Sequence, residues 1–274
     1  LEGGAARIAM SLHKNAGEYG FESTFAYGYG KGAKPSITSQ LDEQGFFYMT
    51  SRTRAIINYS THGLFGIDCI SPGLKKKEQL LSKIREADII HLHCIHSYFI
   101  SYRWLLSTLI QQKKKVIWSI HDDWVITGRC AFSADCVNWG RGCGSCPHRK
   151  YYPGAIIDVS RHEAKIKRQL IKNLPNCTFV AVSNNVAEKV KEIYPEHRTE
   201  VITNGLDPEF ERKANKTKVI SVKQTKDFLN ILIVSADLSY PKKQNISLIK
   251  KVSQVAKSNL ITVGAKSPYK GANV

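Results

Sequence analysis

An apolar run that ends abruptly in polar and aromatic residues is the feature that most constrains the fold of this chain. Residues 116–120 have the length and composition of a buried β-strand, and His121, Asp122, Asp123 and Trp124 follow directly. In an open parallel α/β sheet, ligands bind at the edge where the strands have their carboxyl ends. We therefore predict that His121 and Asp122 are candidate catalytic residues that can reach a substrate.

Four cysteines follow this strand in a stretch without helix or strand periodicity. They are Cys130, Cys136, Cys143 and Cys146, and the last two form a CxxC pair. A loop of this length with few large apolar residues needs a constraint to offset the entropy lost on ordering it. We predict one structural zinc ion held by the four thiolates, with no cofactor for catalysis. Two disulfides or four reduced thiols remain alternatives, because the first cysteines are spaced more widely than in a usual zinc site.

Composition restricts the class of protein and the kind of partner. Lys and Arg outnumber Asp and Glu by 40 to 23 in the 274 residues, a net charge of +17, which indicates an anionic partner. Nucleic acid, an anionic membrane surface and a phosphorylated substrate all satisfy that charge. The seven cysteines are an odd number, which favours reduced thiols. No apolar run approaches the roughly 20 residues of a membrane-spanning helix, and we predict a cytoplasmic protein.

A nucleic-acid-binding module is one competing interpretation. The basic residues are spread over many predicted elements, and the cysteine spacing is not that of a zinc ribbon, so we expect no nucleic acid partner.

Strand and helix patterns alternate along the chain, which predicts a doubly wound parallel α/β sheet. One βαβ unit spans a strand at 87–93, a helix ending near 112 and the strand at 116–120. We predict a first domain over 1–208, a polar linker over 209–228 and the start of a second domain over 229–274. The first strand and most of the second domain are expected to lie outside this sequence.

Three histidines around the end of the strand at 87–93 invite a metal interpretation. They are His91, His93 and His96. Because no helix supports this spacing, we favour core or hydrogen-bonded histidines.

A strongly basic helix is predicted over 158–174. Its cations are Arg161, Lys165, Lys167, Arg168 and Lys172. We interpret them either as a solvated face or as a contact that holds the protein at the inner face of an anionic membrane.

Several motifs together resemble a known family. They are Gly3 and Gly4 at a helix start, YGYGKG at 27–32, His96-Ser97-Tyr98, the HDDW segment with its cysteine loop, Ser183, and TNGLD at 203–207. This set resembles bacterial glycosyltransferases of the GT-B fold and of retaining family 4, most closely those of colanic acid and exopolysaccharide biosynthesis.

The resemblance implies transfer of a sugar, with retention, from a nucleotide-sugar donor to a growing, lipid-linked glycan. It implies that Gly3, Gly4, Asn204 and Lys243 bind the donor, and that Tyr98 and Trp124 bind the acceptor. His121 would contact the transferred sugar. Asp237 stands where the family usually has an arginine, and the family's Glu-x7-Glu pair would lie beyond residue 274. A non-catalytic GT-B scaffold that binds nucleotide or sugar is therefore a second competing interpretation.

Overall fold

Two compact units make up the chain, Leu1–Asp207 and Pro208–Val274. The computed structural model describes residues 3–28, 45–67, 74–96, 98–150, 154–206, 208–216, 229–237, 247, 251 and 258–265. Both units are mixed α/β with parallel strands, so the predicted fold class is confirmed. Among the described residues, no helix combines the length and the apolarity that crossing a bilayer requires.

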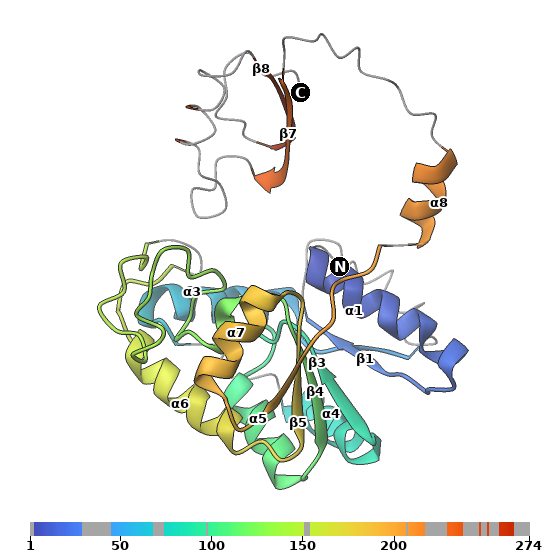
Figure 1. Cartoon of the computed structure of the whole chain (residues 1–274). Coiled ribbons are helices and arrows are strands. Elements are labelled where there is room, and N and C mark those ends of the chain that lie inside the picture. Colours follow the sequence, from blue (N-terminus) through green and yellow to red (C-terminus); the bar gives the residue numbers. More distant parts are fainter. Residues whose placement is uncertain are drawn as a thin grey trace. The chain divides into compact units, whose positions relative to one another are not determined.

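A four-stranded parallel sheet is the centre of the first unit (Figure 1). Its order is β3 (Ile89–Leu92), β4 (Lys115–Ile120), β5 (Cys177–Ala181) and β6 (Arg198–Val201). The strands alternate in sequence with helices α5 (Tyr102–Gln111), α6 (Ser160–Lys172) and α7 (Asn184–Ile193). Because every strand runs in the same direction, the residues that follow the four strands meet at one edge.

The core of this unit lies between the sheet and its helices. Helix α5 begins at Ser101, whose hydroxyl accepts a hydrogen bond from the N–H of Trp104, and it buries Leu105, Leu106 and Leu109. These leucines belong to one apolar cluster with Val116 and Trp118 of β4. The βαβ unit predicted from the sequence is therefore present.

A second, two-stranded parallel sheet pairs β1 (Phe25–Tyr27) with β2 (Phe46–Tyr48). Helix α1 (Gly4–Asn15) and the 3-10 helix η1 (Ala16–Tyr19) precede it, and α3 (Arg52–Phe65) and α4 (Leu74–Glu86) follow it. The sequence did not predict β2, because three aromatic residues in a row show neither strand alternation nor helical spacing.

The first glycine of the glycine-rich turn after β1, Gly28, is required by the packing around it. A Cβ added to Gly28 would lie 2.1 Å from the Cβ of Phe99, so only glycine fits there. The rest of the turn, Tyr29 to Gly32, lies outside the described residues.

The second unit contains α8 (Pro208–Lys216) and a parallel pair, β7 (Leu229–Asp237) with β8 (Ser258–Ala265). Helix α8 falls in the first half of the stretch predicted as a linker. Its proline stands at the first helical position and lysines occupy its last turn, both of which favour a helix. The rest of that stretch and most of the predicted helix at 246–256 lie outside the described residues.

Candidate active site at the carboxyl edge of the sheet

Two histidines meet where strands β3 and β4 end. His93 comes directly after β3 and His121 directly after β4, and these strands are neighbours in the sheet. The His93 Nδ1 and His121 Nε2 atoms are 2.9 Å apart, and the rings stack with their centroids 5.2 Å apart. His121 therefore lies at the edge where the sequence predicted it. Its hydrogen-bond partner His93 was not predicted.

Both imidazoles of this pair are neutral near pH 7. Burial, with the nearby charges of His91 and His121, lowers the pKa of His93 to about 3. Burial also lowers the pKa of His121, although Asp122 opposes the shift. One ring therefore donates the shared hydrogen bond and the other accepts it. His121 is left with its Nδ1 for a neutral hydrogen bond to a ligand.

Asp122 is mainly engaged by its own protein neighbours. Its Oδ1 accepts a hydrogen bond from the N–H of Trp124 at 3.0 Å, which begins the 3-10 helix η2 (Asp123–Val125). Its Oδ2 lies 3.4 Å from Nε2 of His96 and 3.9 Å from Sγ of Cys94. Asp122 thus fixes the turn beside His121, while its part in the chemistry remains a prediction.

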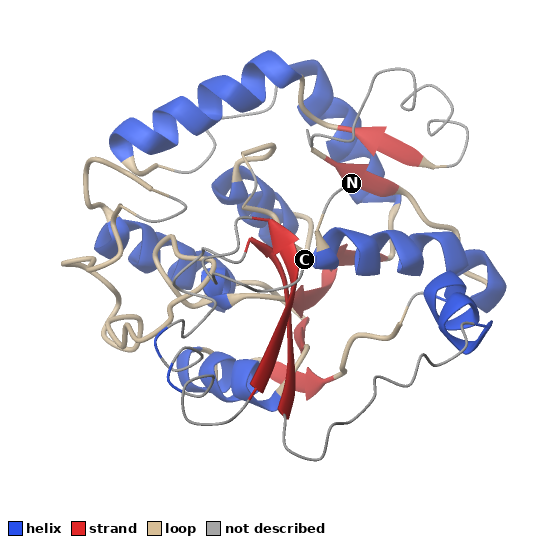
Figure 2. Ribbon diagram, turned by 90° about the horizontal axis from the view of Figure 1, so that it is seen from above, coloured by secondary structure: helices blue, strands red, loops and turns tan. Residues whose placement is uncertain are grey.

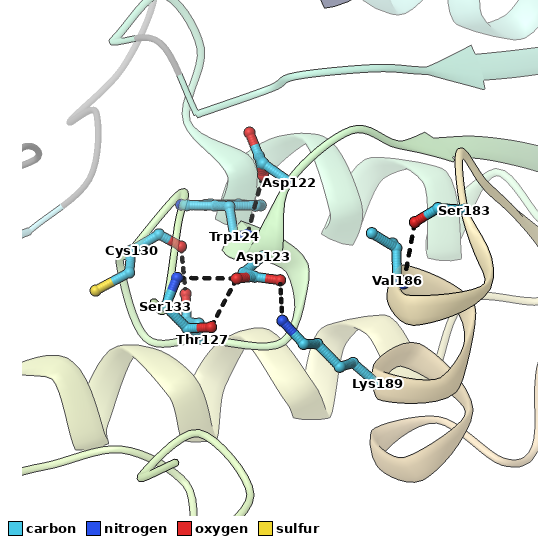
Figure 3. Close-up of polar contacts among 9 residues, drawn as sticks. All are labelled: Asp122, Asp123, Trp124, Thr127, Cys130, Ser133, Ser183, Val186 and Lys189. Carbon is cyan, nitrogen blue, oxygen red and sulfur yellow. Dashed lines mark hydrogen bonds and ion pairs between the residues drawn. The ribbon is translucent and has the colours of Figure 1, made fainter. Parts of the chain in front are cut away.

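Asp123 anchors the segment from the other side (Figure 3). It is 5% exposed, and its Oδ2 accepts hydrogen bonds from the backbone N–H and the hydroxyl of Ser133 at 2.8 and 2.7 Å. Its Oδ1 lies 3.1 Å from the ammonium of Lys189 on α7. This role could not be predicted from the sequence, because Asp122 and Asp123 are adjacent and identical.

The loop that follows η2 is held by cations from α6. We call residues 126–150 the cysteine loop; it contains neither helix nor strand (Figure 2). Lys167 is 1% exposed, and its ammonium donates hydrogen bonds to the carbonyls of Trp124, Thr127 and Gly128 at 2.8, 2.9 and 3.4 Å. Arg168 donates to the carbonyls of Ile126 and Trp139. These loop carbonyls have no ladder partners, so they take donors from side chains instead.

The interpretation of helix 158–174 as a face of five available cations is therefore wrong for two of them. Lys167 and Arg168 are engaged by the loop, and Arg161 lies against Gly144. Lys165 and Lys172 are exposed.

Close contact between the cysteine loop and α6 also requires glycine at position 128. A Cβ added to Gly128 would lie 2.0 Å from the carbonyl oxygen of Ser160, so no larger residue fits.

The two residues predicted to bind the acceptor line one small cavity. Trp124 is 5% exposed, stacks on His96 with centroids 5.3 Å apart and lies 3.5 Å from the ammonium of Lys167. Tyr98 is half-buried and has a φ of 61°, a strained conformation for tyrosine. The cavity measures about 10 Å³, room for at most a water molecule. Acceptor binding by Tyr98 and Trp124 stays a prediction, since both side chains serve packing here.

The structure describes some of the residues predicted to bind the donor and not others. Gly3 is the N-cap of α1 with a φ of 102°, and space is open around the position of a Cβ. No side chain caps α1 and its first turn has no acidic residue, so its N–H groups can face an anion. Asn204 is exposed in the segment after β6, at the same edge as His121. Lys243 and the side chain of Asp237 lie outside the described residues.

The four loop cysteines lie around a second small cavity of about 20 Å³. None of the described cysteines forms a disulfide. One group in the described part of the chain has three metal-ligating atoms within 4.8 Å of one another, namely Cys94, His96 and Asp122. The loop cysteines are therefore gathered around one cavity, and Cys130 hydrogen-bonds Cys146, but no three of their sulfurs lie within 4.8 Å of one another.

The lowered pKa of His93 predicts a loss of stability in acid. An unfolded histidine titrates near 6.5, so below that pH the unfolded chain binds a proton that the folded chain excludes. The stability that neutral His93 contributes to the folded state is fully present above about pH 6.5. It is lost as the pH falls toward 3, where the free energy of unfolding decreases by about 1.4 kcal/mol per pH unit. Urea unfolding between pH 7 and pH 5 should show a smaller slope in His93→Gln. An unchanged slope would mean that another group is responsible.

Comparison with known proteins identifies the family of the chain. The model of Glycosyltransferase Family 4 matches residues 2–210. The chain is 32% identical over 281 aligned residues to the "Putative colanic acid biosynthesis glycosyl transferase WcaC" of Escherichia coli (strain K12), covering 100% of this chain and 68% of that protein. No solved structure matches the chain. The chain belongs to glycosyltransferase family 4 and is a glycosyltransferase.

Proposed function

We propose that this glycosyltransferase moves a sugar, with retention, from a nucleotide-sugar donor to a growing, lipid-linked exopolysaccharide. Family membership supports a nucleotide-sugar donor and a glycan acceptor. The relative named for colanic acid biosynthesis supports an exopolysaccharide product. The observation that carries the proposal is the pairing of His93 and His121 at the carboxyl ends of adjacent parallel strands.

The transfer requires charge to be stabilised on the leaving group. The bond between the anomeric carbon and the phosphate oxygen breaks, and the acceptor oxygen bonds to that carbon on the same face. The proton of the acceptor hydroxyl passes to the departing diphosphate, which leaves as a nucleoside diphosphate. In this proposal the N-terminus of α1 at Gly3 and Gly4 stabilises this anion, and donor binding by Lys243 rests on the family resemblance alone. No metal ion is needed for this step.

His121 has a different task in this proposal. A neutral imidazole can hydrogen-bond a sugar hydroxyl without competing with the diphosphate for cations. His93 fixes the ring of His121 through the 2.9 Å contact, and Asp122 fixes the turn that follows it. His93 and Asp122 are positioning residues, whereas His121 contacts the transferred sugar.

Replacing His121 should lower turnover without weakening the affinity for the nucleotide. We expect His121→Ala to reduce kcat by about 100-fold or more, because a hydrogen bond that strengthens in the transition state is lost. The Kd for the nucleoside diphosphate should stay unchanged, since that part of the donor does not touch His121. Both quantities can be measured with a panel of uridine and guanosine diphosphate sugars.

His197→Ala is the matched control for this experiment. His197 is also half-buried, and it bonds the carbonyl of Ile171 through Nε2 at 2.9 Å, but it precedes β6 and so lies at the opposite edge. Turnover should persist in this variant. Wild-type turnover in His121→Ala, or a loss matched by unfolding in both variants, would contradict the assigned role.

The lipid-linked acceptor motivates a second part of the proposal, peripheral binding to an anionic membrane. The net charge of +17 and the exposed Lys165 and Lys172 of α6 support it. Each cation near an anionic surface adds about 1 kcal/mol, so neutralising both lysines with Gln should weaken vesicle binding about 30-fold. Co-sedimentation with phosphatidylglycerol vesicles measures this, and Lys113→Gln with Lys115→Gln, which removes the same charge from exposed lysines outside α6, is the control. Binding that depends on neither salt nor anionic lipid would contradict it.

A further inference from the structure

The cysteine loop carries an inference that the transfer reaction does not use. We propose that Cys130, Cys136, Cys143 and Cys146 bind one zinc ion in a closed, structural site. All four side chains line the same cavity, whose volume of about 20 Å³ holds one water-sized sphere. A zinc ion is smaller than a water molecule, so the space is sufficient.

The backbone around the second pair of cysteines is held in an uncommon conformation. Four consecutive residues have positive φ, at 86° for Gly142, 61° for Cys143, 93° for Gly144 and 47° for Ser145. Two of these are not glycine, and such strained conformations persist where the surroundings fix them. The turn directs Cys143 and Cys146 into the same cavity.

Backbone N–H groups point at sulfur in this loop. The N–H of Gly128 donates to Sγ of Cys143 at 3.1 Å, and the backbone of His148 hydrogen-bonds Cys146. Such donors stabilise the negative charge of a thiolate, which is the form that binds zinc.

Buried positive charge around the cavity points independently to an anionic ligand complex. Arg129 lines the cavity and is 3% exposed. Its Nη2 donates to the carbonyl of Arg149 at 2.7 Å, but its Nε and Nη1 are buried without a hydrogen-bond partner. Lys167 and Arg168 also lie close enough to act on Cys143. Arg129 also acts on Asp158 and on the sulfur of Cys146, so the cation already lies beside one carboxylate and one loop cysteine.

Zinc with four thiolates would add negative charge beside Arg129, Lys167 and Arg168. The ion contributes two positive charges and the thiolates four negative ones, so the complex carries a net charge of −2. Asp158 supplies one negative charge near Arg129, and its two oxygens accept hydrogen bonds from the N–H groups of Cys146 and Ser160 at 2.7 and 3.0 Å.

Binding must draw the sulfurs together. Zinc–sulfur bonds of about 2.3 Å place tetrahedral sulfurs about 3.8 Å apart, closer than any three of the loop sulfurs lie to one another without the ion. Rotation of the short cysteine side chains around the cavity accomplishes this. Because four sulfurs leave no open position, the ion fixes the loop between η2 and α6 and takes no part in transfer.

Metal content tests the proposal on the whole chain, purified with reductant and without chelator. Elemental analysis should give about one zinc per chain, and Cys→Ser at each of the four loop positions should abolish it. Cys177→Ala is the control, because Cys177 is buried on β5 outside the loop. Cobalt added to metal-stripped wild-type protein should give the intense visible absorption of tetrahedral thiolate coordination, a readout that does not require the variants to fold.

Three results would overturn the proposal. The first is absence of zinc together with the mass of two disulfides within the loop. The second is absence of both zinc and cobalt absorption while all loop thiols react with a thiol reagent. The third is zinc that survives every loop substitution and is lost in Cys94→Ser, which would assign the metal to Cys94, His96 and Asp122.

Discussion

The ammonium of Lys167 is the interaction on which the edge of the sheet depends. Placing a charge in the interior is costly unless hydrogen bonds replace its water, and here three backbone carbonyls and the face of Trp124 do so. Those carbonyls belong to the chain that leaves β4. One side chain of α6 therefore orders a segment that has no helix or strand ladder of its own.

Asp123 completes this arrangement from the opposite side of the same segment. Lys167 neutralises backbone dipoles, whereas Asp123 neutralises the ammonium of Lys189 and takes two donors from Ser133. Between the contacts of Lys167 and those of Asp123, the chain turns away from the strand. His121 lies at the strand end, and Asp122 contacts His96. The site is thus positioned by sheet topology for its histidine pair and by buried charges for the turn that follows.

The sequence predicted the parts that depend on local pattern. The apolar run at 116–120 and the βαβ unit to which it belongs identify the strand end, and they put His121 directly after a strand, as in the structure. Partners distant in sequence were not predictable in this way, such as His93 for His121 or Lys189 for Asp123. Lys167 had a readable signal: it falls between Ala164 and Ile171 on the buried stripe of α6, where helical spacing predicts the core. Because lysine is charged, Lys167 was instead predicted to be exposed.

The central claim is that a neutral His121, held by His93, lies beside the sugar being transferred. Nitrogen NMR of imidazoles labelled with ¹⁵N tests it directly, by recording the ring signals at pH 7 with nucleoside diphosphate alone and then with the nucleotide sugar. We expect neutral rings for both histidines and a shift of the His121 signals that requires the sugar. A charged imidazolium at either position, or His121 signals that do not respond to any sugar nucleotide that the protein binds, would contradict it.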